Sequence, residues 1–188
     1  TKLGSGTLTL TGTNSYEGAT LVNNGRLVLV TGASCSNSAV TVQSSGSGAQ
    51  AIFAVRYTLA DAQAAVAGLT TDAGVGGGSA PVLEFAFSAV PSATTAPLAV
   101  TGSAAFAATP NVRVILTGLT VPTGAYPLMT VGGAAPSAVP ALTVAGGYSG
   151  CTLSWNENTL MLNLEGSAAP IKWGSGSAGS GAWNINDG

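Results

Sequence analysis

The acidic side chains are the first candidates for chemistry, because two facing carboxylates can cleave a glycosidic bond. For that reaction the two groups have to lie about 5 to 10 Å apart. Glu157 and Glu165 flank a predicted hairpin and could approach each other, although such a turn is also an ordinary place for solvated acids. We therefore do not predict an acid/base pair. The full acidic set is Glu17, Asp61, Asp72, Glu84, Glu157, Glu165 and Asp187.

The sequence lacks the usual nucleophile and metal motifs. It contains no histidine, which excludes Ser-His-Asp triads and His-bearing zinc sites. No serine has the G-x-S-x-G context, and a cysteine nucleophile would lack its histidine base. Residues 174–179 match G-x-G-x-x-G but lack the acidic residue that a dinucleotide site needs about 20 positions later. We expect no enzymatic activity, no cofactor and no metal.

The two cysteines, Cys35 and Cys151, have neither metal-binding nor redox spacing. A disulfide between them would close a long loop and stabilise the fold by roughly 5 kcal/mol in the chain-entropy picture. Two buried free thiols that behave as small hydrophobic side chains explain the residues equally well. An extracellular setting would favour the disulfide.

Aromatic side chains can bind sugars by stacking, and Trp155 is the candidate because it lies beside the predicted hairpin. Aromatic residues on strands more often fill a core or cover the edge of a sheet. Core packing is therefore the alternative role for this tryptophan.

The composition excludes several classes of protein. Charged residues make up 6% of the chain and the net charge is −2, so no basic stripe can neutralise the phosphates of a nucleic acid. A hydrophobic content of 46% argues against a disordered chain. Prolines and glycines interrupt the long uncharged stretches, and no run reaches the roughly 20 apolar residues of a membrane-spanning helix. The first residues are no signal peptide and do not begin with Met, which we interpret as a mature product or an excised fragment.

Short segments with alternating, β-branched residues dominate the chain and predict an all-β fold. Each segment is bounded by Gly, Pro, Asn or Ser, as expected for strands joined by turns. The predicted strands are residues 7–11, 27–30, 40–42, 52–55, 82–87, 98–101, 112–117, 126–131, 142–144, 152–155 and 160–164.

One segment has a helical pattern instead. Residues 58–61 have the form of a capping box, and the alanine-rich residues 62–67 end at Gly68. The residues that would share an apolar face at helical spacing are Leu59, Ala62, Val66 and Leu69. We expect one short helix here, packed over an end or side of the β structure.

An internal repeat indicates how the strands are stacked. Residues 6–10 reappear as residues 25–29, a shift of 19 positions. A shift of about 20 residues is typical of a solenoid in which each turn holds two or three short strands. Inward-facing Leu and Val would then form columns, with Thr, Ser and Asn outside. A β-sandwich would give similar strands without this register and remains the alternative fold.

Residues 4–29 closely resemble the autotransporter-associated β-strand repeat, which reads approximately G-x-G-T-L-T-L-T-G-x-N-T-Y-x-G-x-T-x-V-x-x-G-x-L-x-L. Residues 124–128 and 153–162 resemble a later strand and the closing hairpin of such passengers. Residues 172–173 and 181–184 resemble the opening of a following unit. These later similarities are looser.

The resemblance implies a right-handed parallel β-helix with a C-terminal hairpin, exported from a bacterium and displayed at or beyond its outer surface. Together with the Gly/Ser-rich composition near the C-terminus, it implies a solenoid domain at 1–166 and a linker with the start of a following strand or joint segment at 167–188. The sequence departs from such passengers by containing two cysteines, and it holds no translocator barrel.

A β-helix has open strand edges at both ends, and these edges could pair between copies of the chain. Because the surface carries few charges, copies would not repel one another. We therefore expect end-to-end self-association through the terminal strands. The candidate residues are Thr7, Leu8, Thr9, Leu10, Lys172, Trp173, Trp183 and Ile185.

These observations predict a non-enzymatic extracellular structural protein, namely a surface stalk or fibre subunit with an adhesive role. A carbohydrate-binding module of a longer secreted protein, contacting surface glycans through Trp155, is the alternative. A β-helix lyase or hydrolase is a third hypothesis. It is disfavoured because Arg26, Arg56 and Arg113 are isolated in sequence and no Asp-rich loop is present.

Overall fold

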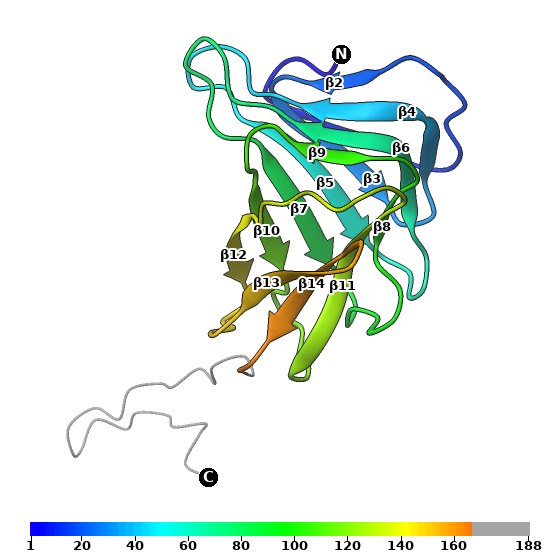
Figure 1. Ribbon diagram of the computed structural model, residues 1–188, viewed down its shortest axis with the longest axis vertical. Helices are drawn as coiled ribbons and strands as arrows, with labels where there is room; N and C mark the ends of the chain where they lie inside the picture. Colours follow the sequence, from blue (N-terminus) through cyan, green and yellow to red (C-terminus); the bar gives the residue numbers. More distant parts are fainter. Residues whose placement is uncertain (167–188) are drawn as a thin grey trace, which may run out of the picture.

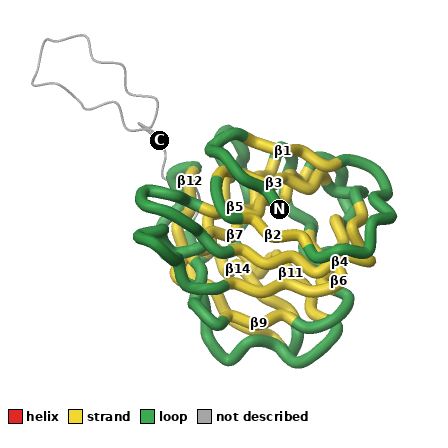
Figure 2. The backbone as a smooth tube through the Cα atoms, turned by 90° about the horizontal axis from the view of Figure 1, so that it is seen from above, coloured by secondary structure: helices red, strands yellow, loops and turns green. Residues whose placement is uncertain are grey.

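Successive strands of the chain alternate between two sheets, which makes the molecule a β-solenoid. The computed structural model describes residues 1–166, and among them every regular element is a strand (Figures 1 and 2). In Figure 1 the colour passes from blue beside the N-terminus to orange at the last strand, so the chain advances along the solenoid as it coils. The prediction of an all-β solenoid is confirmed, and the sandwich is not formed.

The first sheet is parallel throughout and lies in the order β1-β3-β5-β7-β10-β12. Early in the chain every second strand belongs to this sheet, because the strand between two of its neighbours in sequence belongs to the other sheet. Its strands are β1 (Thr7–Leu10), β3 (Gly25–Val30), β5 (Ala51–Tyr57), β7 (Val82–Phe87), β10 (Asn111–Ile115) and β12 (Ala141–Ala145).

The second sheet has the order β13-β14-β11-β8-β6-β4-β2, with β9 beside β6. It is parallel from β2 to β11, after which β14 and then β13 are each added antiparallel. Its strands are β2 (Thr20–Val22), β4 (Ser34–Val42), β6 (Ala64–Thr71), β8 (Leu98–Val100), β9 (Ala104–Phe106), β11 (Gly124–Val131), β13 (Thr152–Asn156) and β14 (Thr159–Leu164).

The internal repeat is the register of the first sheet. Thr7 of β1 aligns with Arg26 of β3, which is the same shift as in the sequence repeat, so the two copies lie side by side. Later turns are longer, because Ile52 of β5 aligns with Val82 of β7 across a wider interval of the chain. The added residues lie in the connections, which is why no further copy of the repeat can be read from the sequence.

The core lies between the two sheets and is built from aligned apolar columns. Leu27, Phe53 and Leu83 align across the first sheet, and all three are at most 2% exposed. Alternate residues of each strand point into this space, as the period of a β-strand requires. Burial of these columns is the main source of stability.

The predicted short helix is wrong. Residues 58–63 form a turn in which Asp61 has a φ of 60°, and the alanine-rich stretch that follows is strand β6. β6 is paired on one side with β4 and on the other with β8 and β9. Its alternate residues Ala64 and Val66 are fully buried, so packing between neighbouring strands outweighs the weak helical propensity of this short stretch.

Two glycine-rich connections, residues 43–50 and 72–81, lie against each other on the side of the solenoid. Ser45 forms a parallel bridge with Val75. A Cβ placed on Gly78 would lie 2.5 Å from the carbonyl oxygen of Ser44, so glycine is what permits this close approach. The two connections therefore form a packed projection.

Candidate functional site

The N-terminal end of the solenoid is the most exposed part of the described chain. β1 is the terminal strand of the first sheet, and within residues 1–166 no strand is paired with its free side. Leu3, Leu8 and Tyr16 are 67%, 45% and 41% exposed at this end. The end thus combines a free strand edge with apolar side chains.

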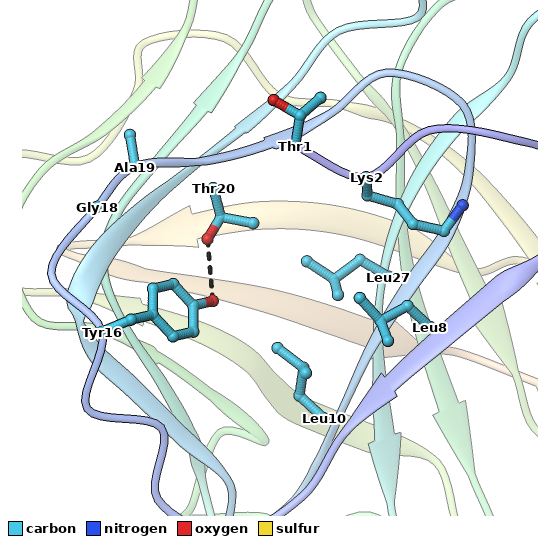
Figure 3. A pocket seen from close by; sticks show the side chains of 9 residues that line it. All are labelled: Thr1, Lys2, Leu8, Leu10, Tyr16, Gly18, Ala19, Thr20 and Leu27. Atoms are coloured by element: carbon cyan, nitrogen blue, oxygen red, sulfur yellow. Dashed lines mark hydrogen bonds between the residues drawn. The ribbon is translucent and has the colours of Figure 1, made fainter.

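Of these side chains, Leu8 and Tyr16 border a depression of about 340 Å³ (Figure 3). Leu8, Leu10 and Leu27 line one side of the depression and face Tyr16 on the other side. Leu8 and Leu10 belong to the same inward columns that are buried further along the solenoid. The depression therefore lies at the end of the hydrophobic core, where no strand of residues 1–166 covers these columns.

Three hydroxyl groups beside this depression are linked by hydrogen bonds. The Tyr16 hydroxyl is 2.9 Å from the Thr20 hydroxyl, which is 2.8 Å from that of Ser38. Ser38 in turn donates to the carbonyl of Gly18 at 2.8 Å. Burial raises the pKa of Tyr16, and the hydrogen bond from Thr20 opposes this shift. The tyrosine is thus held in place as a neutral hydrogen-bonding group.

The first turn is fixed to the second by backbone contacts around Gly25. Gly25 has a φ of 70°, and a Cβ there would overlap the carbonyl oxygens of Gly4 and Gly6. The Lys2 ammonium donates to the carbonyl of Asn24 at 3.0 Å as well as to two nearby carbonyls. These contacts explain the glycine at this position and the close packing of the first turn.

At the opposite end, the first sheet finishes with β12 and the second with β13. Tyr148 covers part of this end: its hydroxyl donates to Leu119 O and accepts from the Val121 N–H, both at 2.7 Å. The ring is only 8% exposed. Leu142 and Val144 of β12 are partly buried against the core, and no strand within residues 1–166 pairs with the outer side of β12.

Trp155, the candidate for sugar contact, lies on β13 and is partly buried. Its indole N–H donates to the Ala138 carbonyl at 3.1 Å, and its ring lies 6.2 Å from that of Phe106. The residue packs against the hydrophobic core. One part of the indole is therefore engaged within the fold, and contact with a glycan stays a prediction.

The disulfide considered between Cys35 and Cys151 is not formed, and both thiols are free. Cys35 is buried in β4, whereas Cys151 immediately precedes β13, five strands away in the same sheet. With about 4.8 Å between neighbouring strands, the separation is about 24 Å, far beyond the roughly 7 Å limit between the Cα atoms of a disulfide. Burial raises the pKa of the Cys151 thiol, and the nearby Glu165 raises it further.

The two acids that flank the predicted hairpin do not approach each other. Glu157 lies in the turn that joins β13 to β14, and Glu165 follows the far end of β14. The whole length of a strand separates them, so they cannot act on one bond. Among residues 1–166, no three His, Cys, Asp or Glu side chains lie close enough together to hold a metal ion.

One charged cluster was not predicted from the sequence. Glu84 of β7 is 1% exposed and forms ion pairs with Arg26 of β3 and Arg113 of β10. The Nε of Arg113 donates to Glu84 at 2.7 Å. Burial lowers the pKa of Arg26, and Arg113 and Arg56 lower it further. Arg26 and Arg113, which are isolated in the sequence, therefore meet at Glu84 on the outer face of the first sheet.

The register contains the signal that would have located this cluster. Glu84 aligns with Arg113 directly, one turn later. On the other side, Glu84 aligns with the small Ala54 of β5, and Ala54 aligns with Val28 of β3. Arg26 lies two residues before Val28 on that strand. Because turn length varies along the chain, the alignment could not be extended from the first repeat.

Residues 1–29 match the family model of the passenger-associated-transport-repeat. The chain carries this repeat at its N-terminus. The match covers β1, β2 and most of β3, and together with the solenoid it fits an autotransporter passenger β-helix repeat protein. The search of curated proteins and the search of solved structures each found no match.

The remaining predicted site residues, Lys172, Trp173, Trp183 and Ile185, lie outside the described residues, as does the expected linker at 167–188. They stay predictions. Thr7 to Leu10 form β1, the outermost strand of the first sheet within residues 1–166, and their pairing with another copy also stays a prediction. Within residues 1–166, the solenoid contains no helix that is long and apolar enough to cross a membrane.

Proposed function

We propose that this chain is a non-enzymatic extracellular structural domain, acting as a surface stalk or as the subunit of a self-assembling fibre, with adhesion as an additional role. The observation that carries the proposal is the parallel solenoid that begins with a passenger-associated-transport-repeat. Continuous ladders and apolar columns make such a structure rigid along its axis. The low charge, 6% of residues, is compatible with close contact between copies.

The coil of the proposed domain is right-handed. Parallel strands that are joined through a crossover follow this hand in almost all proteins, because right-twisted strands lead the connection back onto the sheet in that sense. The resemblance to passenger β-helices supports the same hand.

The location is tested by labelling intact cells of the bacterium that encodes the chain with antibodies against residues 1–166. Labelling of intact cells, with elongated particles on negatively stained cells, is the expected result. Signal that appears only after cell lysis would overturn the extracellular role. The purified chain is examined in parallel by electron microscopy at several concentrations.

A carbohydrate-binding module is the second candidate, because Trp155 lies on the terminal strand of the second sheet and is only partly covered. A glycan array tests this function directly. Binding at millimolar or tighter affinity that is lost in Trp155→Ala would support it. Phe106→Leu, which alters the neighbouring ring without removing the indole, is the matched control.

A further inference from the structure

The charged side chains of the strands lie together on one face of the solenoid. The strands of the second sheet contain no charged residue, whereas those of the first sheet contain Arg26, Arg56, Glu84 and Arg113. On each strand these residues are flanked by buried core positions, so the alternation of a β-strand places all four on the outer face of the sheet. Three guanidinium groups and one carboxylate leave this face with two positive charges in excess.

The rest of the described chain has the opposite charge. Among residues 1–166, one lysine and five acids lie outside the strands, and the only acid that forms an ion pair with an arginine is Glu84. The molecule is therefore acidic as a whole, while one of its faces attracts anions. The five acids outside the strands are Glu17, Asp61, Asp72, Glu157 and Glu165.

Glu84 fixes the orientation of Arg113, its neighbour on β10. The Nε of Arg113 donates to Glu84 at 2.7 Å, and the Nη2 group forms an ion pair with the same carboxylate oxygen. Because a guanidinium is planar and has five N–H donors, its Nη1 edge points away from Glu84 with donors to spare. The Arg113 side chain is 39% exposed, so this edge can bind a second anion.

Arg26 reaches Glu84 from the opposite side of the sheet. Its strand lies two strands away, about 10 Å, so the apolar stem of Arg26 crosses β5 over Ala54, which is 1% exposed. Arg56 follows Ala54 by two residues on β5, is exposed, and forms no ion pair within residues 1–166. Burial lowers the pKa of Arg26, and the charges of Arg113 and Arg56 lower it further. A bound anion would relieve this repulsion.

The spacing of the arginines indicates the kind of anion. The register places their Cα atoms about 12 to 16 Å apart on three different strands. The face of a sheet has no unpaired backbone groups, so a peptide cannot be added there as a strand. Three cations are too few for duplex DNA, with a charge about every 1.7 Å, or for a membrane surface, which attracts clusters of about four to eight basic residues. An extended polymer with widely spaced anionic groups fits this face.

We propose that the outer face of the first sheet binds a linear acidic polysaccharide, whose carboxylate or sulfate groups contact Arg56 and Arg113. The inference rests on the adhesive role proposed above and names the class of its ligand. Glu84 is a positioning residue, because it holds the guanidinium of Arg113 with one edge directed to the ligand. That edge forms paired hydrogen bonds that the ammonium group of a lysine cannot reproduce.

Isothermal titration calorimetry of the whole chain with two polymers tests the proposal. Dextran sulfate supplies sulfate groups and polygalacturonate supplies carboxylates, so the pair distinguishes the two anions. Neutral dextran is the control for the sugar backbone. We expect at least one acidic polymer to bind, with an affinity that falls as salt is added, and neutral dextran not to bind. Binding of neither acidic polymer at low salt would overturn the proposal.

Two variants with the same change in net charge locate the site. Arg56→Ala removes an exposed cation of the outer face, and Ser47→Asp adds a negative charge at an exposed residue of the connection 43–50. Arg56→Ala should weaken binding about tenfold, and Ser47→Asp should change it less than twofold. Equal losses from the two variants would show that net charge alone attracts the polymer.

Two further variants test the role of the fixed guanidinium. Arg113→Lys keeps the charge and should weaken binding at least fivefold. Glu84→Gln adds a net positive charge, so simple attraction predicts tighter binding, whereas loss of positioning predicts weaker binding. Circular dichroism verifies that each variant is folded before the titration. Tighter binding by folded Glu84→Gln together with unchanged binding by Arg113→Lys would overturn the proposed geometry.

Other ligand classes are distinguished by the same titration. Tighter binding of duplex DNA or of vesicles containing phosphatidylglycerol than of either acidic polysaccharide would overturn the ligand class. Absence of polysaccharide binding by a chain that labels intact cells would overturn this inference but leave the surface stalk intact. Binding by a chain that is labelled only after lysis would overturn the extracellular role and leave the binding face, so the two failures are distinguishable.

Discussion

The Cys151 thiol shows how its surroundings determine the reactivity of a single residue. Burial and the carboxylate of Glu165 both raise its pKa, so less of the reactive thiolate is present at a given pH. We expect alkylation by iodoacetamide to be slower than for a peptide thiol at pH 8, and to accelerate as the pH rises. Glu165→Gln should lower the pKa and speed the reaction; an unchanged rate profile, followed by mass spectrometry, would contradict this.

The buried carboxylate of Glu84 forms ion pairs with both Arg26 and Arg113. Removing Arg113 would leave a carboxylate that is 1% exposed with Arg26 as its remaining ion-pair partner. We expect Arg113→Ala to lower the free energy of unfolding by about 2 kcal/mol, less than for a fully buried pair because Arg113 is partly solvated. Urea unfolding measures the loss, and the exposed Arg56→Ala should change stability by less than about 0.5 kcal/mol.

At the scale of elements, Gly25 joins the first turn of the solenoid to the second. Gly25→Ala combines a positive φ with overlap of the Gly4 and Gly6 carbonyls, and should cost about 3 kcal/mol. Gly12 has a similar φ of 66° but open space around it, so Gly12→Ala should cost about 1 kcal/mol. Gly18→Ala, which has neither constraint, should be nearly neutral. Equal losses in thermal unfolding for Gly25 and Gly12 would show that the close approach is unimportant.

The turn between β13 and β14 places a non-glycine residue in the left-handed region. Glu157 has a φ of 51°, a conformation that costs an L-residue roughly 1 kcal/mol. Glu157→Gly should therefore stabilise the fold by about 0.5 to 1 kcal/mol. Asn158→Gly at the next position serves as the control, because its φ is not positive and glycine there should destabilise. A lower midpoint of thermal unfolding for Glu157→Gly would contradict this assignment.

The comparison of sequence and structure also differs between elements. Strands such as residues 82–87 were predicted from their β-branched and aromatic residues between turn signals, a pattern that is local to the segment. Residues 58–67 were predicted as a helix from a capping-box pattern and a run of alanines, and neither indicates which strands pack beside the segment. Their conformation is decided by β4 and β8, strands that are distant in sequence. The Glu84 cluster was missed for the same reason, since its three members are contributed by three different turns.

At the scale of the whole molecule, stability should vary along the solenoid axis. The central strands β5 and β7 are paired on both sides and largely buried, whereas β1 is paired on one side and exposed. We expect amide hydrogen exchange to be slowest in β5 and β7 and faster by at least a hundredfold in β1, because opening of the end leaves the rest of the ladder intact. Uniform protection along the chain would contradict a solenoid that opens from its end.

For the whole molecule, the segment 1–29 was enough to predict the architecture, since it contains the repeat and its register. Of the candidate site residues, Thr7 to Leu10 form the outermost strand of the first sheet within residues 1–166, and their pairing with another copy stays a prediction. That β12 is the outermost strand at the other end of this sheet among the described residues was not predicted, because this depends on how the last connections fold back. The disulfide was considered from the loop that it would close and from the extracellular setting, and neither contains information on the five-strand separation of the two cysteines.

The unequal length of the turns has a consequence for how such a chain can diversify. The connections lengthen over the first turns while the aligned strands keep their register. The cost of closing a longer connection grows only slowly with its length, so residues can be inserted between strands at little expense to the columns. The paired connections at residues 43–50 and 72–81 are two such additions that support each other. A solenoid of this kind can therefore acquire new surface by insertion, turn by turn, while the scaffold that displays it stays unchanged.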